Sequence, residues 1–410
     1  MAYHPGMTNP LLAQLGGYPL AAFQDLQRRM AAEDAPLHDF SIGDPVEPTP
    51  EFIRAALTNG LSPVSQYPTA AGLAELRAAI AGWVQRRFGV TVDPDRHVLP
   101  TAGSKEAVFH LPLGLLDAAG PRRAVIWGDP GYMVYERGQL LAGGTSDPVA
   151  LRDDAGWRLE LEELGRQRLQ RACLVWINYP HNPTGAVADL DYHRRMLAGA
   201  REHGVVLASD ECYTDTYPVD AEPPPSLLQA ADGDLSGLVV AFSLSKRSGM
   251  TGYRSGALVG DPELIRDQRL LRPNIGTASP EFVQRAAVAA WSDDVHAAER
   301  RAIFDAKRAV LLEFLDDAGI RVSGSEATFY IWFAAPGGDD AAYAEALLHH
   351  RVIASPGRAF STVMRGGGGA DAPAAGRGWL RLALVPSVEG CHAAVALWRS
   401  AIADGSLPGH

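Results

Sequence analysis

Residues 237–254 read GLVVAFSLSKRSGMTGYR, and this stretch decides both the fold class and where a functional site is sought. Its first six residues form a short apolar run that is typical of a buried strand. The run ends at Phe242, and Lys246 follows four residues later. An ammonium group at the end of a buried strand is costly, because desolvation disfavours the charged form. We therefore expect Lys246 to be bonded to a cofactor.

Similar apolar runs occur along the chain and alternate with amphipathic helical segments such as 190–204. Near-continuous apolar strands separated by helices predict an α/β fold, with a mainly parallel sheet covered on both faces. The first four runs are followed at once by the polar segments GDPGY, NYPHNPTG, DECY and SLSK. Since open α/β sheets bind ligands at the carboxyl ends of their strands, these segments are expected to meet at one site. The runs are residues 124–127, 172–177, 204–209, 237–242 and 255–260.

The sequence pattern divides the chain into three parts. Residues 1–50 are expected to form an N-terminal arm and a strand of the smaller domain, and residues 51–290 the large domain. Residues 291–410 predict a smaller α+β domain with strands within 320–334 and 378–386. The Gly-, Ala- and Pro-rich tract 364–378 predicts a surface loop.

Composition excludes several classes of protein. The 410 residues are 47% hydrophobic and 21% charged, as is usual for a globular enzyme and unlike a disordered chain. A net charge of −11 argues against binding of nucleic acid or anionic membranes. The three cysteines, Cys173, Cys212 and Cys391, fit neither a disulfide framework nor a zinc site, so no metal and a cytoplasmic location are expected. No signal peptide or apolar run long enough to span a membrane is recognised.

Taken together, SLSKRSGMTGYRSG, NYPHNPTG and SDECY resemble the class I/II aminotransferases of fold type I, which use pyridoxal 5′-phosphate. The motifs occur in the family's order, and the resemblance runs from about Ser41 to the end of the chain. It implies a sheet of the seven-stranded type between helices. It also implies a homodimer with shared active sites, acting on amino acids and 2-oxo acids.

The resemblance assigns the reacting residues. Lys246 is implied to form the Schiff base and then to act as the base that moves the substrate proton. Asp210 resembles the aspartate that pairs with the pyridine nitrogen, although a helix N-cap is its plainer interpretation. Asn182 and Tyr213 match the pair that donates hydrogen bonds to the ring oxygen; NPTG also suits a simple turn.

The cofactor phosphate needs several donors. Gly103 and Ser104 open an apolar-periodic helix, where free amides and the helix dipole suit an anion. Ser243 and Arg254 are implied to complete the phosphate site, and Tyr67 resembles the tyrosine that reaches the phosphate of the neighbouring subunit. Three further cofactor contacts are implied: Ser245, Lys105, and Tyr132, which would stack on the ring unless it is a core aromatic.

Substrate recognition requires a cation for the α-carboxylate. Arg381, inside the apolar run GWLRLALV, resembles the family arginine that binds this group in bidentate fashion. Gly43 matches the position where the backbone passes over the ligand, and Asn182 is implied to contact substrate as well. Lys105, Arg272 and Asn274 are candidates for the distal end of the substrate, with a solvated lysine an equal alternative for Lys105.

Substrate identity follows from the closest resemblance, which is to succinyldiaminopimelate aminotransferases of lysine biosynthesis. The expected reaction is a ping-pong exchange between N-succinyl-LL-2,6-diaminopimelate and 2-oxoglutarate. LL-diaminopimelate, aspartate and aromatic donors remain alternatives, as does a carbon–sulfur lyase. Two departures from the close relatives are candidates for redirecting substrate choice: Arg358 in ASPGRAF, and residues 249–251. A sensor domain of a transcription regulator is disfavoured, because no basic DNA-binding domain precedes the enzyme-like part.

Overall fold

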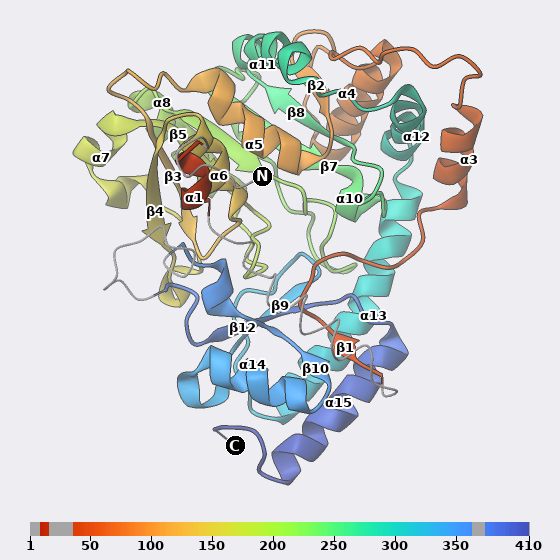
Figure 1. The fold of residues 1–410 in the computed structure, drawn as a ribbon, viewed down its shortest axis with the longest axis vertical. Coiled ribbons are helices and arrows are strands. Elements are labelled where there is room, and N and C mark those ends of the chain that lie inside the picture. Colours follow the sequence, from red (N-terminus) through yellow and green to blue (C-terminus); the bar gives the residue numbers. More distant parts are fainter. Residues whose placement is uncertain (1–8, 16–35, 363–373, 410) are drawn as a thin grey trace, which may run out of the picture.

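The computed structural model describes residues 9–15, 36–362 and 374–409. Within these ranges the chain forms a large seven-stranded sheet, a separate three-stranded sheet and a two-stranded pair. Figure 1 shows the large sheet and its helices above and the smaller sheets below, with the long helix α13 (Val295–Asp317) running from one part to the other.

The seven-stranded sheet confirms the predicted α/β fold. Its order is β2-β8-β7-β6-β5-β3-β4, and its central neighbours are parallel. Strand β8 is antiparallel to both of its neighbours, which explains why the fifth apolar run carries no polar segment at the site edge. All five predicted runs are strands, whereas β2 and β4 were not predicted. The strands are β2 (Val98–Thr101), β3 (Ala124–Asp129), β4 (Thr145–Ala150), β5 (Ala172–Ile177), β6 (Val206–Asp210), β7 (Leu238–Ser243) and β8 (Gly256–Gly260).

Alternating side chains of these strands build two apolar layers. Residues such as Val240 and Phe242 pack on the face covered by α4, α8 and α12, and Val239 and Ala241 pack on the face covered by α5, α6 and α11. Because the side chains on both faces of such a strand contact an apolar layer, its sequence is a continuous apolar run. The covering helices are α4 (Ala74–Phe88), α5 (Ser104–Leu115), α6 (Val134–Leu141), α8 (Leu190–Glu202), α11 (Pro262–Ile275) and α12 (Glu281–Ser292).

Smaller elements connect these layers. The helices are α1 (Leu11–Gln14), α3 (Glu51–Asn59), α7 (Arg166–Arg171), α9 (Leu227–Ala230) and α10 (Leu244–Arg247). The 3-10 turns are η1 (Asp153–Ala155), η2 (Leu161–Leu164), η3 (Pro336–Gly338) and η4 (Gly357–Phe360).

The three-stranded sheet is antiparallel, in the order β11-β12-β9. It consists of β9 (Tyr330–Ala334), β11 (Ser355–Pro356) and β12 (Trp379–Ala383), packed with α14 (Asp340–His349) and α15 (Val388–Ala403). The predicted strand within 320–334 is shorter than its apolar run, because a turn at Ser325–Thr328 interrupts it.

The strand expected within residues 1–50 is β1 (His38–Asp39), which pairs in parallel with β10 (Val352–Ile353) beside the smaller sheet. The remaining arm lies largely outside the described residues, as does most of the predicted loop 364–378. The domain boundary at residue 290 stays a prediction. No helix in the described ranges has both the length and the apolarity that crossing a membrane requires.

Candidate active site

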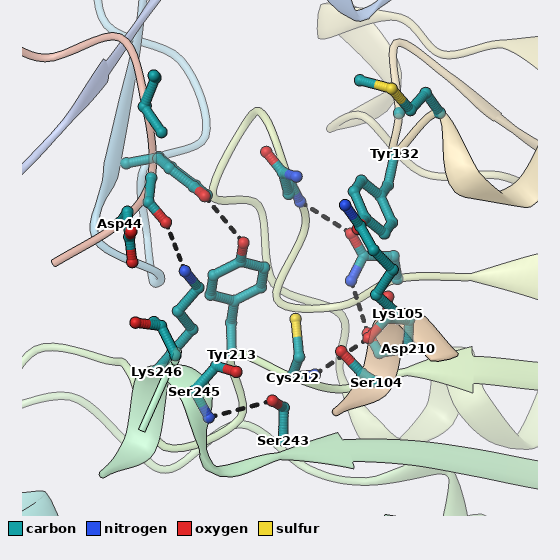
Figure 2. A pocket seen from close by; sticks show the side chains of 18 of the residues that line it. Asp44, Ser104, Lys105, Tyr132, Asp210, Cys212, Tyr213, Ser243, Ser245 and Lys246 are labelled. Carbon is teal, nitrogen blue, oxygen red and sulfur yellow. Dashed lines mark hydrogen bonds between the residues drawn. The ribbon is translucent and has the colours of Figure 1, made fainter. Parts of the chain in front are cut away.

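A cavity of about 420 Å³ lies where the carboxyl ends of the parallel strands face the smaller sheet. The segments after β3, β5, β6 and β7 meet there, as the strand-end rule predicts. Figure 2 shows Lys246 and Tyr213 on one side of this cavity and Ser104, Lys105 and Asp210 on the other. The predicted site residues that line it are Gly43, Ser104, Lys105, Tyr132, Asn182, Asp210, Tyr213, Ser243, Ser245, Lys246, Arg254 and Arg381.

Lys246 lies on α10, the short helix that follows β7. Ser243 caps this helix by accepting a hydrogen bond from the backbone N–H of Ser245 at 3.1 Å. The Lys246 ammonium donates to the carbonyl oxygen of Gly43. Burial lowers the pKa of Lys246 to about 8, because the charged form loses its hydration. Near neutral pH this amine is therefore readily converted to the neutral form that a nucleophile needs.

Asp210 is the last residue of β6 and is fully buried. Its carboxylate accepts hydrogen bonds from the Tyr135 hydroxyl at 3.1 Å and from the Cys212 backbone N–H at 3.3 Å. Among the described residues no cationic side chain pairs with it, and burial raises its pKa to about 6. A buried carboxylate without a cation is suited to receive one from a ligand.

Arg381 on β12 is buried with its guanidinium in the cavity wall. It donates from Nη1 to Oδ1 of Asn182 at 2.9 Å and from Nη2 to the Ser41 carbonyl at 2.7 Å. Its guanidinium also lies over the rings of Tyr330 and Phe360, 4.2 and 4.4 Å from their centroids. No carboxylate of the described residues forms an ion pair with it, so an anionic ligand would complete its surroundings.

The bond from Arg381 also fixes the role of the Asn182 amide. Because Oδ1 accepts from the guanidinium, the Nδ2 hydrogens remain available as donors. The Asn182 loop is held by Asn178, whose Oδ1 accepts from the Asn182 backbone N–H at 3.0 Å. Asn178 also donates to the Asp210 carbonyl at 2.6 Å, so the ends of β5 and β6 are joined.

The start of α5 is a candidate site for an anion, with Gly103 at the N-cap and Ser104 as the first residue. Arg254 packs closely here, since a Cβ added at Gly103 would lie 2.5 Å from its Nη2 atom. Gly103 also has φ +83°, a second reason for glycine. Lys105 stands nearby, and burial, Arg254 and Arg137 lower its pKa. This concentration of cations and free amides suits a dianion such as a phosphate.

Tyr132 lines the cavity from the loop after β3 and contacts the Tyr135 ring edge-on, at 5.7 Å between centroids. Tyr132 is half-buried and borders the cavity, whereas a core aromatic would be fully buried.

Four residues predicted for the site do not line this cavity: Gly103, which lies at the N-cap of α5, and Arg272, Asn274 and Tyr67. Arg272 is buried in an ion pair with Glu106 at 2.8 Å, and Glu106 also accepts from the backbone N–H of Ala102. Arg272 therefore supports the turn before α5 and does not face the cavity. Asn274 is exposed and donates to the carbonyl of Leu270, and Tyr67 is fully exposed.

The two departures from the family pattern also differ in position. Arg358 binds Asp340 at 2.7 Å and Asp339 at 2.6 Å at the start of α14, so its guanidinium is engaged outside the cavity. Thr251, by contrast, lines the cavity.

Several cavity residues were missed by the sequence analysis. Asn178 and Cys212 lie within the quoted segments NYPHNPTG and DECY, so the strand-end rule was sufficient to find them. Tyr330 and Phe360 come from the smaller sheet region, which the strand-end rule does not cover. Tyr135, the hydrogen-bond partner of Asp210, lies on helix α6 and was also not predicted. Asp44 was also missed, although it directly follows Gly43.

The family model for aminotransferase class I and II matches residues 35–396. The chain belongs to this family. The LL-diaminopimelate aminotransferase of Desulforudis audaxviator is 35% identical over 87% of this chain and 91% of its own length. That of Aquifex aeolicus is 32% identical over 86% of this chain and 88% of its own length.

Solved structures agree with this assignment. An aminotransferase from Neisseria meningitidis superimposes with a TM-score of 0.86 and is 34% identical, covering 96% of this chain and 100% of its own. A probable N-succinyldiaminopimelate aminotransferase from Thermus thermophilus has a TM-score of 0.83 and 28% identity, covering 93% of this chain and 100% of its own. The aminotransferase described here is thus a transaminase dependent on pyridoxal 5′-phosphate.

Proposed function

We propose that this aminotransferase takes the amino group from a diaminopimelate-type amino acid and passes it to 2-oxoglutarate. The observation that carries the proposal is the 35% identity, over 87% of the chain, to a protein named LL-diaminopimelate aminotransferase. Relatives with that name support the unsubstituted donor. The N-succinyl donor stays a prediction, supported by resemblance and by the name of the 28% identical Thermus structure.

The residues present fit the cofactor at each of its polar groups. A buried Asp210 without a cation suits a protonated pyridine nitrogen, and the cationic turn at Gly103 and Arg254 suits the phosphate. The close approach of Arg254 leaves no room for a side chain at Gly103. Bound pyridoxal phosphate supplies an electron sink that stabilises negative charge at the substrate Cα.

We assign Lys246 as the residue that holds the cofactor and then moves the Cα proton at its Nζ atom. With a pKa lowered to about 8, the amine accepts a proton without being permanently charged. Asp210 would stabilise the ring cation, while Asn182 and Tyr213 would donate to the ring oxygen. Tyr132 would pack on the ring, Ser104, Ser243 and Arg254 would bind the phosphate, and Lys105 and Ser245 would make further contacts to the cofactor.

Arg381 binds the substrate α-carboxylate and so orients the Cα–H bond. Its two outer nitrogens are held by Asn182 and by the Ser41 carbonyl, and its ring contacts fix the plane of the guanidinium. A carboxylate reaching this buried cation replaces water with a charge-assisted pair. Gly43 carries no side chain where a Cβ would collide with the Tyr330 hydroxyl.

We also propose that the enzyme is a homodimer in which Tyr67 reaches the phosphate of the neighbouring subunit. Tyr67 is fully exposed in the single chain, and apolar side chains around it are exposed as well: Val64 by 64% and Leu61 by 56%. A second copy would cover this surface. Asn274, also exposed, is a candidate for the same neighbouring site.

A donor panel tests the substrate proposal. LL-diaminopimelate, N-succinyl-LL-diaminopimelate, aspartate and phenylalanine are each supplied with 2-oxoglutarate, and glutamate formation is measured. We expect the highest kcat/KM with one of the first two donors. Higher values for aspartate or phenylalanine would overturn the diaminopimelate assignment, and pyruvate released from cystathionine without an acceptor would indicate a carbon–sulfur lyase.

A further inference from the structure

A hydrogen bond between two tyrosines joins the smaller sheet to the proposed cofactor site. Tyr330 is the first residue of β9, and Tyr213 follows β6 of the seven-stranded sheet. Their hydroxyl oxygens are 2.8 Å apart, both residues are buried and both line the cavity. The dashed line at the Tyr213 hydroxyl in Figure 2 marks this bond.

The Tyr330 hydroxyl lies in a tightly packed position. A Cβ added at Gly43 would lie 2.2 Å from it, and the Gly43 carbonyl accepts the hydrogen bond of Lys246. The face of the Tyr330 ring carries the Arg381 guanidinium. Tyr330 thus contacts both the residue proposed to bind the substrate carboxylate and the backbone that binds Lys246.

The number of hydroxyl protons sets the direction of the bond. A phenol has one proton to donate and two lone pairs that accept. If Tyr213 gives its proton to the ring oxygen of the cofactor, as proposed above, the proton between the two phenols must come from Tyr330. A phenol that accepts such a bond is polarised and becomes a stronger donor.

We propose that Tyr330 is a positioning residue that strengthens the hydrogen bond from Tyr213 to the cofactor and thereby lowers the pKa of the Lys246–cofactor linkage. This inference rests on the proposed function. Because Tyr330 lies in the smaller sheet and Tyr213 lies in the turn after a strand of the larger sheet, the acidity of the linkage depends on how closely the two sheets approach. The other titratable or charged groups that line this cavity are Asp44, Lys105, Tyr132, Asp210, Cys212, Lys246, Arg254 and Arg381.

The test compares four purified holoenzyme variants by the pH titration of their visible absorbance: Tyr330→Phe, Tyr213→Phe, the double variant and Tyr343→Phe. Phenylalanine at 330 keeps the ring under Arg381 and removes only the hydroxyl. Tyr343, on α14, is a matched control. It is fully buried in the same apolar cluster as Tyr330, but its hydroxyl accepts a hydrogen bond from Trp398 at 2.9 Å.

We expect Tyr330→Phe to raise the pKa of the absorbance change by roughly 0.5 to 1 unit, the equivalent of losing one net hydrogen bond. Tyr213→Phe should raise it further, and adding Tyr330→Phe to that variant should change nothing more, since Tyr330 acts through Tyr213. Tyr343→Phe should titrate as the wild type does.

Two results would overturn the inference and leave the proposed function intact. The first is a Tyr330→Phe titration identical to that of the coloured wild type. The second is that Tyr330→Phe shifts the pKa of the absorbance change equally in the wild type and in the Tyr213→Phe variant. The second would indicate a general effect on packing. A wild-type protein that binds no cofactor would overturn the proposed function, and this inference with it.

Discussion

The guanidinium of Arg381, from the smaller sheet, and the amide of Asn182, from the loop after β5, are hydrogen bonded at 2.9 Å. The group proposed to bind the substrate carboxylate therefore also orients a group proposed to bind the cofactor. The two ends of the active site are coupled through a single buried contact.

Replacing Arg381 by lysine is expected to lower kcat/KM for amino acid donors strongly. Lysine keeps the charge but not the planar fork that binds both Asn182 and the carboxylate. The loss corresponds to about 2–5 kcal/mol, roughly 30-fold or more, as for a truncated buried charge pair. Steady-state kinetics measure it. Arg358→Lys is the control, because Arg358 binds Asp339 and Asp340 outside the cavity, and equal losses in both variants would contradict the assignment.

Attachment of the cofactor to the apoenzyme is expected to speed up with pH and to level off above about 8. The pKa of Lys246 is lowered to about 8 by burial, so the ammonium predominates below that pH and the nucleophilic amine above it. Stopped-flow absorbance after mixing with pyridoxal phosphate gives the rate. A rate that does not change between pH 6 and pH 9 would rule out this role for the amine.

Asp210→Asn is expected to stabilise the apoprotein at pH 8. It is also expected to reduce turnover of the holoenzyme by about 100-fold or more, because a preorganised charge is lost. The pKa of Asp210 is raised from 3.8 to about 6, so wild-type stability is lost as pH rises through that interval. Removing the ionisation recovers up to about 3 kcal/mol at pH 8 and progressively less below pH 6. Urea unfolding at several pH values measures this. Asp191→Asn, at an exposed carboxylate paired with Arg194, is the control and should show no pH-dependent gain in the free energy of unfolding. If Asp210→Asn also showed no such gain, Asp210 would not be a buried charge in the apoprotein.

Arg272→Ala is expected to destabilise the protein by about 3–5 kcal/mol, because it leaves Glu106 as an unpaired buried charge. Asn274→Ala, at an exposed position two residues away, should change the free energy of unfolding by less than about 0.5 kcal/mol. Denaturant unfolding of the apoprotein distinguishes the two. Equal stability of both variants would contradict the structural role given to Arg272.

The sequence predicted the sheet because strands buried between two layers of helices are apolar on both faces. It therefore found β3, β5, β6, β7 and β8 but not β4, whose segment TSDPVA is polar and lies at the sheet edge. Strand β2 is buried but has only four residues and includes a proline, which weakens the pattern.

The candidate site was predictable to the extent that its residues follow strand ends. Lys246, Asp210 and Asn182 obey that rule, and the cavity contains all three. Arg272 was placed in the site only because a cation suited the substrate; its pairing with Glu106 depends on contact between α5 and α11, which local sequence does not encode. Tyr330 was missed because its role depends on how the smaller sheet packs against the larger one.

The central claim is that pyridoxal phosphate is joined to Nζ of Lys246. The most direct measurement is borohydride reduction of the holoenzyme followed by peptide mass spectrometry. We expect a phosphopyridoxyl mass on the peptide that contains Lys246 and loss of the visible absorbance. An unmodified Lys246 peptide, or the same mass on another lysine, would contradict it.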